Sequence, residues 1–222
     1  DKATSYRERK NNYPEFRQGQ GSCAIECLGL GWSGVTYKIN EMSKLFGPVV
    51  QQGYVVPDID KAMQHWISRG VGPFYIEKHI SPPCEINGKK TAVDISAAFA
   101  YSGDQQIEVI VQHNDVPTIY KQYLDKHSEG GLQHLAVWCD NIDEKLAEIG
   151  DQWVVHQRYG DGHAYLDNKK TPGIMIQLMA HSEAIDTMFR FIKAGADSWD
   201  GVTDPIRIID WSTGLPVVKA AK

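Results

Sequence analysis

The sequence predicts an α+β protein built from two tandem βαβββ modules. An order of strand, helix and three strands occurs twice, and the two copies align with an offset of 83 residues. In this alignment Gln51 precedes Ile59 by the same eight positions by which His134 precedes Ile142, and each Ile is followed by Asp. Because the long period occurs only twice, it indicates duplication of a supersecondary unit rather than a solenoid.

The first copy begins with an apolar strand over 49–56. Pro57 and Asp58 break this strand, and Asp60 is the predicted cap of a helix that continues through Ile67. Turn sequences at Asn87-Gly88 and Ser102-Gly103 separate the three strands that follow. These strands are predicted over 74–80, 91–101 and 106–112.

The second copy repeats this order. A strand over 132–138 is followed by a predicted helix cap at Asp143 and a helix over 144–149. Gly160, Gly162 and the pair Pro172-Gly173 separate the remaining strands. These strands are predicted over 153–158, 163–167 and 174–179.

Four segments follow from this pattern. They are an N-terminal extension over 1–46, a first module over 47–128, a second module over 129–181, and a C-terminal helix and arm over 182–222. The extension is either an appended arm or an ordinary strand or loop packed on the body. Apolar residues at helical spacing predict a helix over 183–199 that lies on the outside of the sheet. The rest of the tail is predicted to be an arm that clasps the body or a neighbouring subunit.

Composition restricts the classes of partner. The net charge of −5 and the scattered Lys and Arg residues argue against nucleic acid, which needs a concentrated basic face. No apolar stretch approaches the ~20 residues that span a bilayer, and no signal-peptide cleavage site is evident, so we expect a cytoplasmic protein. The four cysteines lack the paired spacing of a zinc framework.

The two modules resemble the vicinal oxygen chelate superfamily, which includes glyoxalase I, bleomycin-resistance proteins and ring-cleaving dioxygenases. The resemblance covers 49–179 and depends on matching breaks before the two helices, Val-Pro-Asp-Ile-Asp and Cys-Asp-Asn-Ile-Asp. Gly72-Pro73-Phe74 and the two closing strands, over 164–167 and 171–178, reinforce it. The resemblance implies that the modules form a curved mixed sheet around a central cleft, and that the protein is a homodimer.

Members of the family usually place four metal ligands on the cleft face, from the first and last strand of each module. At the corresponding positions this sequence has Gln51, Glu108, His134 and Gln177. All four are polar residues in apolar strands, and burying them together is costly unless they bind something or each other.

The donor types suit a divalent ion. Glu108 and His134 are good ligands for zinc, nickel, iron or manganese, whereas Gln51 and Gln177 are neutral oxygen donors that bind weakly. Glyoxalase I resembles this set but has Glu at the last position, where this sequence has Gln177. The departure matters because an amide cannot act as the base that a carboxylate provides.

The resemblance implies a metal-dependent lyase, isomerase or epimerase that acts on a small carbonyl compound or thioester. In such enzymes the metal chelates two neighbouring oxygens and stabilises an enediolate formed by proton abstraction. Glu108 is then the catalytic carboxylate, and His163, Tyr165 and His113 are further possible proton carriers. The residues expected to contact the substrate are Tyr54, Trp138, His163, Tyr165, Met175 and Met179.

Two other functions stay open. The missing carboxylate at Gln177 and the apolar residues expected in the cleft favour a metal-free binding protein of the bleomycin-resistance kind. A ring-cleaving dioxygenase uses two His and one carboxylate for iron, and Gln51 at the place of a His disfavours it. A structural cluster, in which Glu108 and His134 only bond each other and the two glutamines, is the non-functional alternative.

Overall fold

The computed structural model describes residues 45–170, 173–210 and 217–220. Apart from its last two residues, the predicted N-terminal extension lies outside the described part of the chain. Cys23 and Cys27 lie outside it as well. Among the described residues, no helix is long and apolar enough to cross a membrane.

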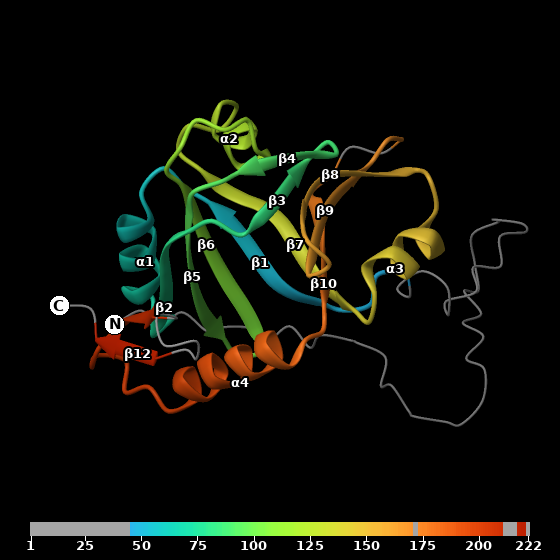
Figure 1. Cartoon of the computed structure of the whole chain (residues 1–222). Helices are drawn as coiled ribbons and strands as arrows, with labels where there is room; N and C mark the ends of the chain where they lie inside the picture. Colours follow the sequence, from blue (N-terminus) through green and yellow to red (C-terminus); the bar gives the residue numbers. More distant parts are fainter. Residues whose placement is uncertain (1–44, 171–172, 211–216, 221–222) are drawn as a thin grey trace, which may run out of the picture. The chain divides into compact units, whose positions relative to one another are not determined.

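Twelve strands of the described residues form one mixed sheet, and two βαβββ modules make up its centre (Figure 1). The first module consists of β1 (Val49–Val55), α1 (Ile59–Ile67), β2 (Phe74–Ile80), β5 (Ile95–Ser102) and β6 (Gln105–Gln112). The second consists of β7 (Gly131–Cys139), α3 (Ile142–Ile149), β8 (Trp153–Tyr159), β9 (His163–Asn168) and β10 (Met175–Ala180). The predicted fold class is therefore confirmed.

The strand order is β2-β5-β6-β1 in the first module and β7-β10-β9-β8 in the second. The first strand of each module pairs in parallel with its last strand, β1 with β6 and β7 with β10. β1 and β7 pair antiparallel, so the two modules join edge to edge within one chain. This seam brings the four predicted ligand strands, β6, β1, β7 and β10, next to one another.

The helix caps lie two residues earlier than predicted. Asp58 accepts the N–H of Lys61 and begins α1, whereas Asp60 lies in the first turn. Asn141 accepts the N–H of Glu144 and begins α3. Asp143 instead accepts a hydrogen bond from Arg158 at 2.7 Å. A cap must precede the first helical residue to reach the free N–H groups, and the two true caps are again 83 positions apart.

A hairpin that was not predicted interrupts the first module. β3 (Pro83–Ile86) and β4 (Lys89–Ala92) pair across the Asn87-Gly88 turn, and β3 also pairs with β8 of the second module. The strand predicted over 91–101 is therefore divided between β4 and β5. A short helix, α2 (Ile119–Leu124), was also missed; its N-cap is Thr118. The hairpin links the two modules on the side opposite to the β1–β7 seam.

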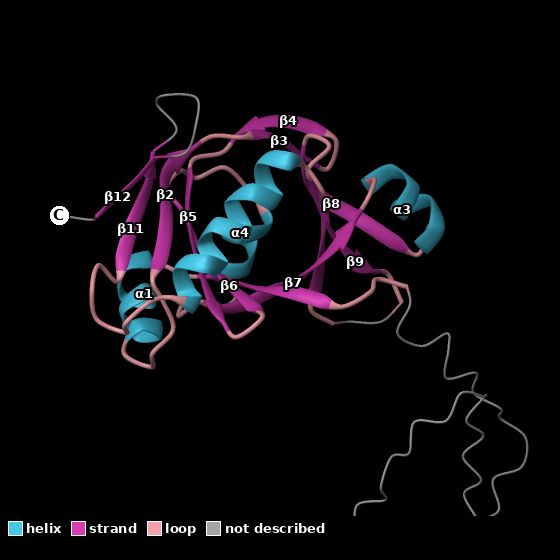
Figure 2. Ribbon diagram, turned by 90° about the horizontal axis from the view of Figure 1, so that it is seen from below, coloured by secondary structure: helices cyan, strands magenta, loops and turns pink. Residues whose placement is uncertain are grey.

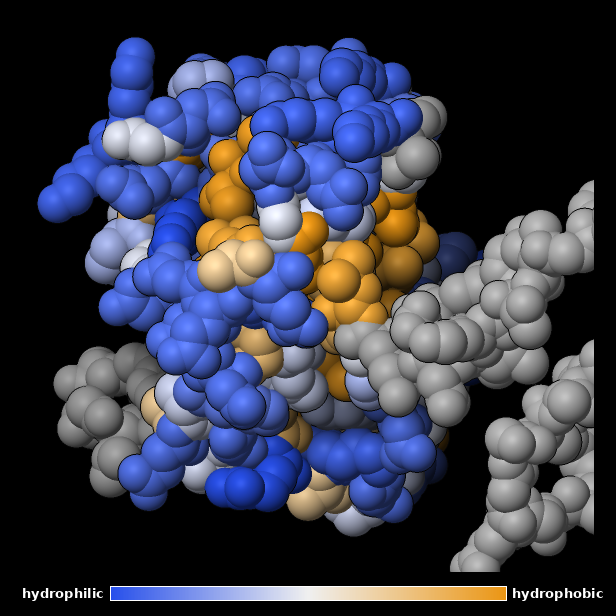
Figure 3. All heavy atoms as spheres, turned by 90° about the vertical axis from the view of Figure 1, so that its right-hand side faces the viewer, coloured by the Kyte–Doolittle hydropathy of each residue, from blue (hydrophilic) through white to orange (hydrophobic). Residues whose placement is uncertain are grey.

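Three apolar clusters hold the helices against the sheet. α1 packs on one face of the first module through Met63, and α3 packs on the second module through Ile142 and Ile149. Half-buried apolar residues accompany the α3 cluster, and Figure 3 shows apolar side chains at the centre of a face otherwise covered by hydrophilic ones.

α4 (Glu183–Asp197) lies on the other face of the sheet, which corrects the prediction that it would lie outside. Phe189 and Ile192 belong to the cluster that includes Phe99, Ile110 and Tyr165 on the concave side. Figure 2 shows α4 running across the opening between the strands of the two modules. The apolar stripe predicted for this helix is real, but it faces the cleft.

The C-terminal arm extends the sheet of the first module. β11 (Ile206–Asp210) pairs in parallel with β2, and β12 (Val217–Ala220) pairs with β11. The arm thus joins the body of its own chain, one of the two possibilities predicted for it.

Candidate functional site

Two rows of side chains cross the seam between the modules. In the first row, the strand register places Gly53 of β1 opposite both Glu108 of β6 and His134 of β7. Gly53 has no side chain, so the two larger residues meet above it, with His134 Nε2 3.1 Å from Glu108 Oε2. An ideal Cβ placed on Gly53 would lie 1.9–2.4 Å from three atoms of the His134 ring. The glycine is therefore required by this contact.

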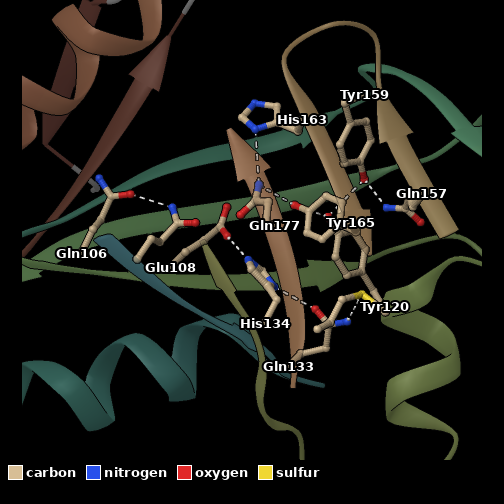
Figure 4. Close-up of polar contacts among 12 residues, drawn as sticks. Gln106, Glu108, Tyr120, Gln133, His134, Gln157, Tyr159, His163, Tyr165 and Gln177 are labelled. Atoms are coloured by element: carbon tan, nitrogen blue, oxygen red, sulfur yellow. Dashed lines mark hydrogen bonds and ion pairs between the residues drawn. The ribbon is translucent and has the colours of Figure 1, made fainter. Parts of the chain in front are cut away.

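The second row lies one pleat further along the strands. Gln51 of β1 and Gln177 of β10 both stand opposite Ala136 of β7. Gln51 Nε2 donates to Gln106 Oε1 at 2.6 Å, and Gln177 Nε2 donates to the Tyr165 hydroxyl at 2.9 Å. All of these side chains are buried. Alternation along the strands therefore brings the predicted ligands to one face, as Figure 4 shows for Glu108, His134 and Gln177.

The glutamines turn unpartnered oxygens toward the site. Since each amide nitrogen is used as a donor, the carbonyl oxygens are the remaining groups, and neither Gln51 Oε1 nor Gln177 Oε1 has a hydrogen-bond partner. Buried carbonyl oxygens normally find a partner, and leaving one without it costs about 1–3 kcal/mol. The second row thus offers two acceptors to a cation or to a donor group of a ligand.

His134 and Glu108 face each other in the first row, and a proton or a metal ion must join them. Gln133 Oε1 lies 2.8 Å from His134 Nδ1, and an amide oxygen only accepts, so Nδ1 carries a proton. Nε2 lies 3.1 Å from Glu108 Oε2, and the two side chains form an ion pair when the ring is protonated. A neutral ring would instead turn a lone pair toward the carboxylate, and a metal ion between the two atoms would then join them. This distance also suits two ligands of one ion, since bonds of about 2.0–2.1 Å place neighbouring donors roughly 3.0–3.4 Å apart.

The residues present therefore fit a divalent ion. The four donors are one imidazole, one carboxylate and two amide oxygens, and a second polar group orients each of three of them: Gln133 for His134, Gln106 for Gln51, and Tyr165 for Gln177. His134 is fully buried and is not among the residues that line the cavity, so it would approach an ion from beneath.

A cavity of about 250 Å³ lies between the sheet and α4. Its polar end is formed by Gln51, Glu108 and Gln177 together with His163 and the tyrosine hydroxyls. Apolar side chains form most of its wall, and α4 contributes several of them. The apolar residues at the wall include Ile80, Ile95, Phe99, Ile110, Met179, Ile185, Met188 and Phe189. Among the described lining residues, none is Lys or Arg.

Two buried tyrosines, Tyr120 and Tyr165, and the half-buried Tyr159 form a chain of hydroxyls beside Gln177 (Figure 4). Gln157 Nε2 donates to Tyr159, Tyr159 donates to Tyr120, and Tyr120 donates to Tyr165 at 3.0 Å. The Tyr165 oxygen accepts from both Tyr120 and Gln177, which leaves its own proton available to a ligand. Burial raises the pKa of all three hydroxyls well above the usual value. Tyr165 is therefore a hydrogen-bond donor rather than a base.

His163 lines the cavity next to Gln177. Its Nδ1 lies 3.3 Å from Gln177 Nε2. Burial lowers the pKa of His163 below its usual value, although the nearby charge of Glu108 opposes the effect. The ring is therefore neutral at pH 7 and can accept a hydrogen bond from Gln177.

Three of the six residues expected to contact a substrate line the cavity, namely His163, Tyr165 and Met179. Tyr54 does not, because strand alternation turns it to the opposite face, where it packs edge-to-face on Trp66 of α1. Trp138 lies on the concave side but stacks on His181 and contacts Phe189. Met175 lies beneath the site, with its sulfur 3.3 Å from Gln133 Nε2. His113 lies at the surface, outside the cavity lining.

Sequence reasoning missed several residues of this site. Gln106 could have been found, since it shares the face of Glu108 by simple alternation. Gln133 could not have been found, because alternation predicts that it points to the face opposite to that of His134. In the structure a register shift between Gly53 and Tyr54 leaves Gln133 without a partner on β1, and its side chain lies beside His134. Tyr120 belongs to the missed helix α2.

Comparison with known families agrees with this architecture. The model of the Glyoxalase/Bleomycin resistance protein/Dioxygenase superfamily matches residues 50–166, just over half of the chain. The chain therefore belongs to this superfamily, and the predicted resemblance to vicinal oxygen chelate proteins is confirmed. A comparison with curated proteins gives no match.

Several solved structures are similar to this chain. Methylmalonyl-CoA epimerase from Mycobacterium tuberculosis is 20% identical, with a TM-score of 0.44 over 64% of this chain and 93% of that one. A variant of methylmalonyl-CoA epimerase from Streptomyces coelicolor is 14% identical, with a TM-score of 0.41 over 62% and 99%. A variant of 4-hydroxymandelate synthase from Streptomyces coelicolor is 15% identical, with a TM-score of 0.40 over 61% and 38%. At these values none of them assigns a reaction to this chain.

Proposed function

We propose that this protein is a metal-dependent enzyme that moves a proton on the carbon next to a carbonyl group of a small substrate, as a lyase, isomerase or epimerase does. The observation that supports this most directly is the approach of His134 Nε2 to Glu108 Oε2 at 3.1 Å, the separation of two ligands of one ion. The unpartnered oxygens of Gln51 and Gln177 complete a donor set of four.

Glu108, His134, Gln51 and Gln177 would hold zinc, nickel, iron or manganese. When bound, such an ion polarises a carbonyl oxygen and makes the neighbouring C–H more acidic. The donor set carries one negative charge, so we expect weaker binding than at a site with two carboxylates.

The side chains of the cavity would transfer the proton and bind the substrate oxygen. Glu108 has two oxygens, and Oε1 can take the proton from carbon while Oε2 faces His134. The Tyr165 hydroxyl keeps its proton and donates a hydrogen bond to a substrate oxygen. His163, neutral at pH 7, is the second group able to accept a proton at this end of the cavity.

The cavity favours a compact, uncharged substrate. Its wall is largely apolar, and the described lining offers no cationic side chain to an anionic group. A thioester substrate would therefore place only its acyl end inside. A cytoplasmic location and a homodimer stay predictions.

A metal-free binding protein is the second candidate. Gln177 supplies an amide where a carboxylate base would stand, and a ligand carrying two hydroxyl or amide donors would satisfy both free carbonyl oxygens. The apolar wall suits such a ligand equally well.

Metal analysis of protein purified without added metal separates the two. The enzyme hypothesis expects about one equivalent of a transition metal at the centre, lost in Glu108→Ala and His134→Ala. Glu144→Ala, an exposed carboxylate of α3, is the control and should keep the ion. Unchanged metal content in both site variants would refute the assignment.

Proton transfer needs its own measurement. Small carbonyl compounds and thioesters that carry a C–H next to the carbonyl group, incubated with the metal-loaded protein in D₂O, should take up deuterium at that carbon, as followed by NMR. Glu108→Gln should abolish this uptake. Ligand binding without deuterium uptake would favour the binding protein.

A further inference from the structure

We propose a second divalent metal site, formed by His79, Asp94 and His113 at the surface of the first module. The three residues come from β2, from the residue before β5, and from the residue after β6. None of them lines the cavity. The proposal is therefore independent of the function assigned to the central site.

The donor atoms already lie close together. One ligand atom from each residue can be chosen so that all three lie within 4.8 Å of one another. His79 Nδ1 lies 3.1 and 3.3 Å from the two oxygens of Asp94, and the two imidazole rings stack with their centroids 4.1 Å apart. Zinc bonds of about 2.0–2.1 Å require donors roughly 3.3 Å apart. Both histidines are exposed, so their side chains have room to rotate toward an ion.

The backbone holds the group in place. His79 has a positive φ of 51° within a register shift of β2, a conformation that L-residues rarely adopt in a strand. Ser96 is buried, and its Oγ accepts the N–H of His79 at 3.1 Å and bonds His113 Nε2 at 2.8 Å. The backbone N–H of His113 donates to the backbone carbonyl oxygen of Asp94 at 2.8 Å. Ser96 thus occupies one ring nitrogen of His113 and leaves Nδ1 for an ion, as outer partners of metal-binding histidines do.

The donor set predicts which ion binds. Two imidazoles and one carboxylate are typical of zinc sites that keep a fourth position for water. The central site has one imidazole and three oxygen donors, so the surface site should prefer zinc, nickel or cobalt more strongly over manganese. The two sites should therefore differ in selectivity as well as in position.

Zinc binding by the full chain, measured by equilibrium dialysis, tests the proposal. His79→Ala and His113→Ala should each bind one equivalent less than the unchanged protein, and Asp94→Asn should bind this equivalent at least tenfold more weakly. All three side chains are at least partly exposed, so thermal unfolding should show that the variants stay folded.

Two controls make the result specific. His65→Ala removes an exposed histidine of α1 outside the group and should leave the stoichiometry unchanged. Glu108→Ala should lose the central equivalent only. If the central assignment is wrong, Glu108→Ala loses nothing while His79→Ala still does. Unchanged stoichiometry in His79→Ala and His113→Ala, or an equal loss in His65→Ala, would overturn the surface site.

Discussion

The two rows that cross the module seam use the same geometry with opposite results. In the Gly53 row, a missing side chain lets Glu108 and His134 approach to 3.1 Å. In the Ala136 row, Gln51 and Gln177 bond outward to Gln106 and Tyr165, and their carbonyl oxygens have no partner. We call the Gly53 row closed, because its two side chains contact each other, and the Ala136 row open, because its two carbonyl oxygens have no partner.

This difference shows how duplication builds an asymmetric site. Each module contributes one ligand to each row, but only the first row contains glycine. The closed pair brings the charged group and the imidazole together, and the open pair supplies neutral oxygens. Variants that separate His134 from Glu108, or that change the groups of the open row, test this difference.

Gly53→Ala should have the largest effect. The added Cβ would lie 1.9–2.4 Å from the ring of His134, which is fully buried and cannot move aside freely. Overpacking of this kind costs about 1–3 kcal/mol, and the displaced ring also loses Glu108. We expect a lower free energy of unfolding by denaturant titration and no bound metal at the centre.

Gly173→Ala is the matched control. Gly173 is exposed, and a Cβ there meets nothing within 4 Å. This variant should retain both stability and metal. If Gly53→Ala matched it in both measurements, the close packing of His134 over Gly53 would be wrong.

Gln133→Leu should weaken metal binding at the closed row by about 10–100-fold, the range typical of lost outer partners. Leu removes the acceptor for His134 Nδ1 and leaves its proton buried and unsatisfied. Gln133→Glu retains an acceptor and should keep the affinity, as measured by competition with a chelating indicator. Equal losses in both variants would show that Gln133 acts through packing alone.

The sequence predicted the repeated unit because its signals are local. The family resemblance assigned Gln51, Glu108, His134 and Gln177 to the cleft face, and the sheet brings their strands together. The register shift at Gly53 defeats alternation at Gln133, since an unpaired residue changes side. The need for Gly53 was also invisible, because it arises only when β6, β1 and β7 lie side by side.

The helix over 183–197 shows a second limit of sequence reasoning. Its amphipathic stripe fixed which residues are buried but not which face of the sheet they cover. Both faces of this sheet are apolar, one beneath α1 and α3 and the other around the cavity. Which face α4 covers depends on the connection from β10. The contribution of α4 to the cavity wall could therefore be seen only in the structure.

Gln177→Glu should sharpen the comparison by adding a charge to the open row. The donor set would then carry two negative charges, and we expect metal affinity to rise about tenfold, which corresponds to roughly 1.4 kcal/mol. The gain is limited because Gln177 Nε2 no longer donates to Tyr165 and His163. Gln157→Glu adds a buried charge outside the donor set and should not raise the affinity; a similar rise there would show a general charge effect.

Tyr165→Phe should have the smallest effect on the ion. Its hydroxyl accepts from Tyr120 and Gln177 but is not a proposed ligand. Gln177 Nε2 keeps His163 Nδ1 as an acceptor, so metal affinity should change less than about threefold. Binding or turnover of a carbonyl substrate should fall about 2- to 10-fold, because one hydrogen bond to a ligand is worth about 0.5–1.5 kcal/mol. Tyr159→Phe lies at the far end of the same chain and should change substrate binding less. Equal effects of the two variants would mean that the chain stiffens the wall and that Tyr165 donates nothing to the substrate.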